Sequence, residues 1–110
     1  MTIYEMNKEQ IIETAEKIAE KTGCELLGLW TDLEHPYCNT IILVSGANIK
    51  MFQKIAYKVF NGLEDLCGNK LIEPNKLYES GYESCELSIT DNESYFNSII
   101  EVCEGVNWIE

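Results

Sequence analysis

The sequence predicts an α+β fold: a single compact domain over residues 1–110 in which helices cover an antiparallel or mixed sheet. Two observations carry this prediction. Apolar residues recur at helical spacing in three separate segments, whereas the segments between them are short and either rich in β-branched residues or alternating in polarity. The expected order of elements is α-ββα-ββα. With 110 residues and a hydrophobic share of 45%, the chain can bury a modest core, and disorder is not expected.

The first expected helix covers residues 8–22. Asn7 can cap its start together with Gln10, three residues later, and Gly23 is placed to end it. Its apolar stripe, at spacings of three and four, consists of Ile11, Ile12, Ala15, Ile18 and Ala19. A strand is then expected over residues 24–31.

A loop over residues 32–39 leads to a β-branched strand over residues 40–45. Because this strand lacks polar alternation, we expect it to be central and covered on both faces. A second helix is expected to start at Ile49 and to end at Gly62 or Gly68. Its inward side chains are expected to be Phe52, Ile55, Ala56, Val59, Phe60 and Leu63.

The last third is expected to add two strands and one helix. A short strand is expected over residues 71–73 and an alternating strand over residues 82–89, with Glu83, Cys85, Leu87 and Ile89 on one face. Thr90 and Glu93 have the spacing of a capping box before a third helix over residues 93–104. That helix is expected to turn Phe96, Ile99, Ile100 and Cys103 inward, to end at Gly105 and to be followed by a tail or edge strand.

A weak internal repeat has an offset of 44 residues. Two sets of residues match, each on a strand that runs into a helix: Leu43, Asn48, Phe52 and Ile55 in the first, and Leu87, Asn92, Phe96 and Ile99 in the second. Duplication is one explanation. Chance is the other, because any strand-then-helix unit needs these residue types.

Charge is the most informative feature for function. The chain has no arginine, and 19 acidic residues against eight lysines give a formal net charge of −11. Residues 71–110 contain nine acidic residues against Lys76 alone. Such a surface repels nucleic acid and acidic membranes, and arginine, the usual ligand for phosphate, is missing. It attracts and steers a basic partner instead.

The residues expected to bind that partner are acidic. A stripe on the first helix has neighbours about 6 Å apart, close to the spacing of charges on a nucleic-acid backbone; the remaining residues lie in the acidic last third. The full set is Glu9, Glu13, Glu16, Glu20, Glu79, Glu83 and Glu86.

An alternative site is the turn between the second strand and the second helix. The turn contains no acidic residue, and free N–H groups at a helix start can receive an anion. Its residues are Ser45, Gly46, Asn48 and Lys50, with Trp30 or Tyr57 expected nearby in a small-molecule sensor or sequestering domain. An ordinary N-cap at Asn48 explains the turn equally well, and the stripe of Lys50, Lys54 and Lys58 fits a solvated helix face.

Nothing in the sequence has a recognisable catalytic or metal-binding arrangement. Asp32, Glu34, His35 and Cys38 share one loop, but His35 is the only histidine, and a spacing of three positions between it and the Cys38 thiol is weak evidence for a site. We therefore expect no catalytic residues, no metal and no cofactor. Five cysteines without a CxxC pair, and no basic-then-apolar start, favour a cytoplasmic protein with free thiols, Cys85 and Cys103 among them in the core.

These observations favour a small acidic cytoplasmic binding protein rather than an enzyme. We expect it to inhibit or regulate a basic protein, such as one that handles nucleic acid, in the manner of phage anti-defence or immunity proteins. Direct binding of nucleic acid or membrane is not expected, and a homo-oligomer is left open.

Overall fold

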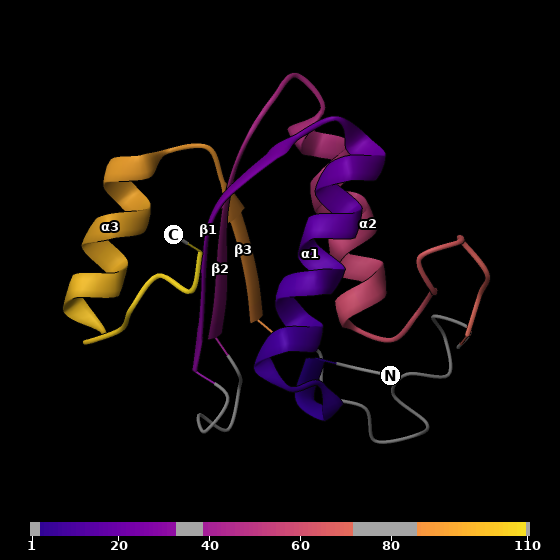
Figure 1. Ribbon diagram of the computed structural model, residues 1–110, viewed down its shortest axis with the longest axis horizontal. Coiled ribbons are helices and arrows are strands. Elements are labelled where there is room, and N and C mark those ends of the chain that lie inside the picture. Colours follow the sequence, from indigo (N-terminus) through magenta and orange to yellow (C-terminus); the bar gives the residue numbers. More distant parts are fainter. Residues whose placement is uncertain (1–2, 33–38, 72–85, 110) are drawn as a thin grey trace.

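The computed structural model describes residues 3–32, 39–71 and 86–109, which form three layers (Figure 1). A sheet of three strands, β1 (Glu25–Asp32), β2 (Asn39–Ser45) and β3 (Glu86–Thr90), lies in the middle. Among these residues, helices α1 (Lys8–Thr22) and α2 (Ile49–Phe60) cover one face, and α3 (Glu93–Val102) is the one helix on the other face. A short 3-10 helix, η1 (Ile3–Glu5), precedes α1. The predicted α+β class is confirmed.

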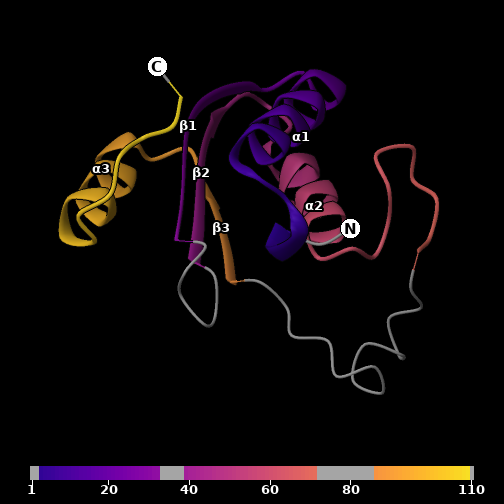
Figure 2. The ribbon, with the colours of Figure 1, turned by 60° about the horizontal axis from the view of Figure 1, so that its bottom comes forward.

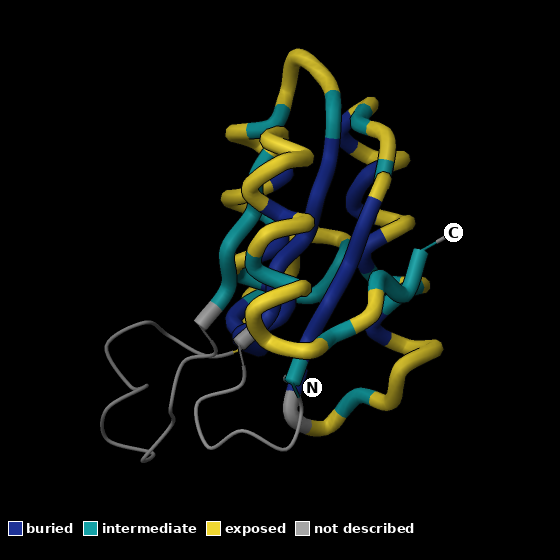
Figure 3. Tube along the Cα trace, turned by 90° about the vertical axis from the view of Figure 1, so that its left-hand side faces the viewer, coloured by how far each residue is buried: buried dark blue, intermediate teal, exposed yellow. Residues whose placement is uncertain are grey.

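The sheet is mixed, with the order β1-β2-β3. β1 pairs with β2 in antiparallel fashion, and β2 pairs with β3 in parallel. Residues 40–44 of β2 are all buried, because helices pack on both faces of this strand, and the prediction of a central strand is confirmed. Figure 3 shows this buried run through the middle of the molecule, with exposed helical turns outside it.

The larger core lies between the sheet and the pair α1 and α2. Its fully buried large side chains include Phe52 and Phe60 of α2, Ile11 and Ile18 of α1, and Ile42 of β2. Burying an aliphatic or aromatic side chain of this size stabilises the fold by about 1.5–3 kcal/mol. The helical periodicity of both segments therefore identified the correct inward faces.

Local signals set the ends of these two helices. Asn7 and Gln10 form the predicted capping box, with each side chain accepting a hydrogen bond from the other residue's backbone N–H. Gly23 ends α1 in the left-handed conformation, with φ of 70°. Gly62, with φ of 73°, follows α2 in the same way, and Leu63 donates to the Lys58 carbonyl at 2.8 Å. Each glycine supplies the positive φ at low steric cost.

The smaller core lies between the sheet and α3. Phe96 is fully buried against Trp30, Ile41 and Leu43. Its ring crosses β1 at Gly28, where an added Cβ would lie 2.7 Å from the ring. A glycine in the strand therefore gives α3 a close approach to the sheet at this one point.

Helix α3 begins at Glu93 as predicted, but its capping residue and its end differ from the prediction. Asn92, not Thr90, is the N-cap: its side chain accepts from the Tyr95 N–H, and Thr90 accepts from the Asn92 N–H. A cap two residues nearer the helix gives better access to its free N–H groups. The helix stops at Val102, before the predicted end, and Cys103 is exposed at the C-cap rather than in the core.

The helix end also corrects the role of Gly105. Glu104 takes the left-handed conformation, with φ of 53°, and the Gly105 N–H donates to the Ile100 carbonyl at 2.8 Å. Gly105 instead lies against the Trp30 indole, where an added Cβ would be 1.7 Å from Nε1. The glycine is needed for close packing, and a glutamate fills the position that usually favours glycine.

Residues 106–109 form the predicted tail, which runs along the free edge of β1. The Trp108 N–H donates to the Leu29 carbonyl at 2.8 Å, and the Asn107 side chain accepts from the Leu29 N–H at 3.0 Å. The tail thus passes from the α3 layer to the α1 layer, where Lys8 Nζ lies 5.3 Å from the centroid of the Trp108 ring.

The remaining expected strands are only partly within the described residues. Leu71 is exposed and not in a strand, and residues 72–73 lie outside them, as do residues 82–85 of the alternating strand. Leu87 and Ile89 share the face toward the larger core, as expected. Within residues 3–32, 39–71 and 86–109, no helix is both long and apolar enough to cross a membrane.

Candidate functional site

The four predicted acids of α1 (Glu9, Glu13, Glu16 and Glu20) are all exposed. They are not alone on that layer, however. Lys17 forms an ion pair with Glu13 at 2.9 Å, and Lys21 donates to the Leu66 carbonyl at 2.6 Å. Helices α1 and α2 together carry six lysines against four glutamates. The layer is therefore mixed in charge, with no net excess of acid.

The α3 layer has a different composition. Residues 86–109 contain five acidic residues and no lysine, whereas six of the seven lysines among the described residues lie on α1 and α2. Four of the five acids, Asp91, Glu93, Glu101 and Glu104, are exposed on or beside α3. The sheet lies between the two layers (Figure 1). Among the described residues, the helix that carries only acidic charges and the pair of helices with mixed charges are therefore on opposite faces of the sheet. We call these four residues the α3 acids.

Sequence reasoning selected other members of the acidic last third. Glu79 and Glu83 lie outside the described residues, and Glu86 is the first residue of β3. The signal for the α3 acids was present, because no lysine follows Lys76. Only the fold shows that the lysines are gathered on the opposite face of the sheet.

The turn from β2 to α2 lies against the C-terminal end of α1. The Asn48 side chain donates to the Thr22 carbonyl at 3.2 Å and makes no capping hydrogen bond to α2. Gly46 has φ of 144° and lies against Cys24, and Lys50 is exposed. An uncapped helix start can attract an anion. No second feature of the described residues points to a ligand there, so the turn stays a prediction.

Trp30, one of the two aromatic residues expected beside this turn, lies elsewhere. Trp30 pairs with Ile41, whereas Ser45 pairs with Glu25 at the other end of the hairpin. Trp30 also faces α3, on the opposite side of the sheet from α2. The expectation that Trp30 lies near the turn is therefore wrong, because strand alternation and length carry it to the other face and end. The candidate loop of His35 and Cys38 lies outside the described residues.

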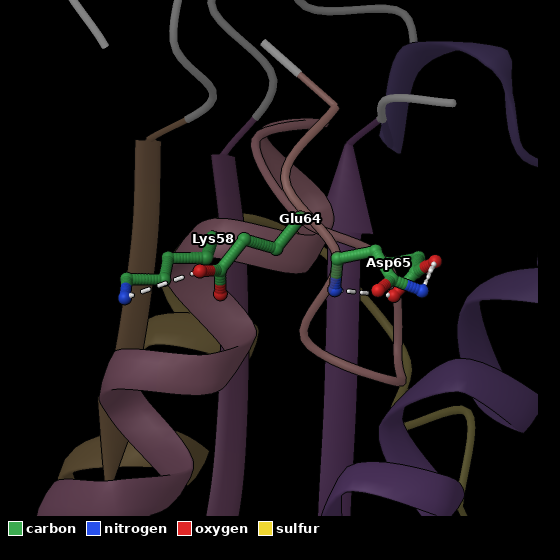
Figure 4. A network of polar contacts seen from close by, with 4 residues as sticks. Lys58, Glu64 and Asp65 are labelled. Atoms are coloured by element: carbon green, nitrogen blue, oxygen red, sulfur yellow. Dashed lines mark hydrogen bonds and ion pairs between the residues drawn. The ribbon is translucent and has the colours of Figure 1, made fainter. Parts of the chain in front are cut away.

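A polar network follows α2 (Figure 4). Lys58 forms an ion pair with Glu64 at 3.5 Å, and the Asp65 carboxylate accepts three hydrogen bonds, two from Asn69 and one from the Cys67 N–H, each at 2.9 Å. The bond from the Asn69 side chain contributes most to a lowered pKa of Asp65, because donors stabilise the charged carboxylate. These contacts satisfy one another and shape the loop.

A pocket of about 300 Å³ lies between α3 and the sheet. Every strand contributes to its lining, with Trp30 from β1, Ile41 from β2 and Ser88 from β3. The α3 side consists of residues four apart on one helix face, and the full lining is Trp30, Thr40, Ile41, Ser88, Tyr95, Ile99 and Cys103. No acidic or basic side chain lines the pocket within the described part of the chain. It can therefore take an uncharged, largely apolar group.

The pocket follows from the coverage of the sheet. Within the described residues, one helix covers this face. Its Phe96 packs closely on Gly28 of β1, whereas the pocket is lined by Ser88 of β3, two strands away. Tyr95, at 44% exposure, and Val102, at 80%, leave further apolar surface on α3. Sequence reasoning missed the pocket because each of its residues also fits an ordinary core or surface position.

Comparison of the chain with protein-family models, with curated proteins and with solved structures finds no match.

Proposed function

We propose that this protein binds a basic protein through the α3 side of its sheet and thereby inhibits or regulates that partner. The observation that supports the proposal is the segregation of charge: the α3 acids share their layer with no lysine among residues 86–109. The acids of α1 lie on the opposite side of the sheet, in a layer that also carries six lysines of α1 and α2, so they are a weaker candidate surface for a basic partner.

The physical basis is long-range attraction. Opposite charges accelerate encounter, and salt weakens the effect because the screening length is only about 8 Å at physiological ionic strength. An acid-only layer presents the same charge as a nucleic-acid backbone, which supports a partner that handles nucleic acid. The protein itself is not expected to bind DNA or RNA, since their phosphates carry the same sign of charge.

The test compares two triple variants of equal net charge. One reverses acids of the α3 side (Glu93→Lys, Glu101→Lys and Glu104→Lys), and the other reverses acids of α1 (Glu9→Lys, Glu13→Lys and Glu16→Lys). A basic protein captured from lysate at low salt and then purified serves as the partner. We expect the α3 variant to slow association several-fold and to flatten its salt dependence, with a smaller effect from the α1 variant.

Equal effects of both triple variants would contradict the proposal, because net charge alone would then explain the association. Thermal unfolding of both variants controls for loss of structure. As a second control, retention of the same partner on polyglutamate resin measures the electrostatic attraction that acidic groups exert without any folded surface. If neither variant changes the association rate, the turn at Ser45, Gly46, Asn48 and Lys50 becomes the better candidate.

A further inference from the structure

The pocket under α3 and the α3 acids lie on the same side of the sheet. The pocket has a mostly apolar lining with hydroxyl groups at Ser88, Thr40 and Tyr95. Among the described residues, all of the exposed charged side chains on or beside α3 are acidic. Protein interfaces commonly have this composition: a buried aromatic or aliphatic anchor fills a central pocket, and polar or charged contacts form the rim.

We propose that the pocket receives a single aromatic side chain of the basic partner, presented by a segment in which lysine or arginine flanks that side chain. The inference rests on the proposed function and adds the chemistry of the segment that docks. Charge complementarity selects this occupant: the α3 acids favour flanking cations, while the uncharged lining excludes a cation from the pocket itself.

The size of the pocket is consistent with one anchoring side chain. A volume of about 300 Å³ lies at the lower end of ligand pockets, which span about 300–1,000 Å³. Trp30 and Tyr95 can offer edge or face contacts to an incoming ring. The hydroxyl of Ser88 can form one hydrogen bond with a ring that carries a polar group, such as the phenol of a tyrosine.

The experiment uses the full chain and three short synthetic peptides. The first has a phenylalanine flanked on both sides by lysines, the second replaces that phenylalanine by alanine, and the third replaces the lysines by glutamates. The two tryptophan indole N–H signals in NMR provide the readout, since Trp30 lines the pocket while Trp108 packs on the α1 side. We expect the first peptide to shift the Trp30 signal, leave the Trp108 signal in place and bind more weakly as salt rises.

A matched pair of substitutions locates the binding. Ser88→Phe fills the pocket from its floor, whereas Ser98→Phe makes the same chemical change on the exposed surface of α3. We expect Ser88→Phe to weaken binding of the first peptide about tenfold, the factor that 1.4 kcal/mol represents, and Ser98→Phe to leave it nearly unchanged. Cys103→Leu narrows the pocket from an exposed helix end and repeats the test if Ser88→Phe fails to fold.

The outcomes separate this inference from the proposed function. If the phenylalanine and alanine peptides bind equally and with the same salt dependence, charge attraction stands and the anchor is wrong. If the glutamate-flanked peptide binds as well as the lysine-flanked one, the pocket takes apolar groups without charge selection, and the proposed occupant is wrong. No shift of the Trp30 signal with any peptide also overturns the inference.

Discussion

The two strand-helix units of this protein, β2–α2 and β3–α3, share a sequence pattern but differ in how completely they are buried. The matched leucines, Leu43 and Leu87, each face away from the helix of their own unit: Leu43 faces the α3 core and Leu87 the α1–α2 core. The matched phenylalanines, Phe52 and Phe96, are both fully buried. The α2 unit shares its face with α1, whereas α3 has no second helix within the described residues.

Figure 2 shows this asymmetry from another side, with α1 and α2 packed together and α3 standing alone. The difference shows that apolar residues at helical spacing specify which side chains of a helix turn inward, but not how completely the helices of a layer cover the face of the sheet. Closure depends on the number of helices per face. On the face of α1 and α2 the helices enclose the larger core, whereas on the other face the single described helix encloses the smaller core and leaves a pocket beside it.

The largest expected effect tests the two phenylalanines. Phe52→Ala and Phe96→Ala should each lower the free energy of unfolding by about 3–5 kcal/mol, because each leaves a cavity in place of a buried ring. Hydrogen exchange should distinguish them: Phe96→Ala should deprotect mainly α3, and Phe52→Ala should deprotect the whole fold. Uniform deprotection in Phe96→Ala would show that α3 belongs to the same cooperative unit as α1 and α2.

The next effect tests the packing of Gly105, just after α3, against the Trp30 indole. Gly105→Ala would place a Cβ 1.7 Å from Trp30 Nε1, so the indole or the tail must shift. We expect a loss of about 1–3 kcal/mol in the free energy of unfolding, as for other overpacked sites. Val106→Ala, at a residue 72% exposed, is the control and should change stability by less than about 0.5 kcal/mol. Denaturant unfolding measures both, and equal values would mean that Gly105 has no packing role.

A smaller effect compares the ends of α2 and α3. Gly62 provides the left-handed residue after α2, but Glu104 provides it after α3. Glu104→Gly should therefore raise stability by about 0.5–1 kcal/mol, because relief of backbone strain outweighs the entropy of glycine. Glu101→Gly removes the same charge inside α3 and should instead cost about 1 kcal/mol. Thermal unfolding of the two variants should give shifts of opposite sign.

The smallest effect concerns the loop after α2. Hydrogen bonds from Asn69 and Cys67 lower the pKa of Asp65, so folding favours the ionised carboxylate. The resulting stability is fully present above the unfolded-state pKa, about 3.9 for aspartate, and is lost as pH falls through the lower folded-state pKa. Asp65→Asn should therefore flatten the acid end of the stability curve slightly. NMR titration of the carboxyl carbon checks the premise, and a midpoint at or above the ordinary value would contradict it.

Local signals predicted most of the fold. The capping box of Asn7 and Gln10, the end at Gly23 and the β-branched run of β2 act within a few residues, and the structure bears out each. The α3 unit was predicted less well because its details depend on contacts between distant segments. Cys103 has the spacing of an inward residue, yet the helix ends before it when the chain turns toward Trp30.

For the candidate site, the sequence predicted the acidic character of the surface but not its position on the fold. The sequence shows that acid dominates, but the segregation of lysines on one face requires the sheet to lie between the helices. The pocket requires residues from three strands and the α3 segment to meet, and Trp30 and Cys103 are 73 positions apart in the sequence. No periodicity within a single segment encodes that meeting.

The tail along β1 bears on the solubility of the molecule as well as on its fold. The outward backbone groups of an edge strand are a template for strand pairing between molecules, which leads to aggregation. Here the Asn107 side chain and the Trp108 N–H occupy the Leu27 carbonyl and both backbone groups of Leu29. The Asn107 amide donates to Leu27 and accepts from Leu29, as the backbone of a neighbouring strand would, and so covers this part of the edge without a further β-strand that could itself be extended.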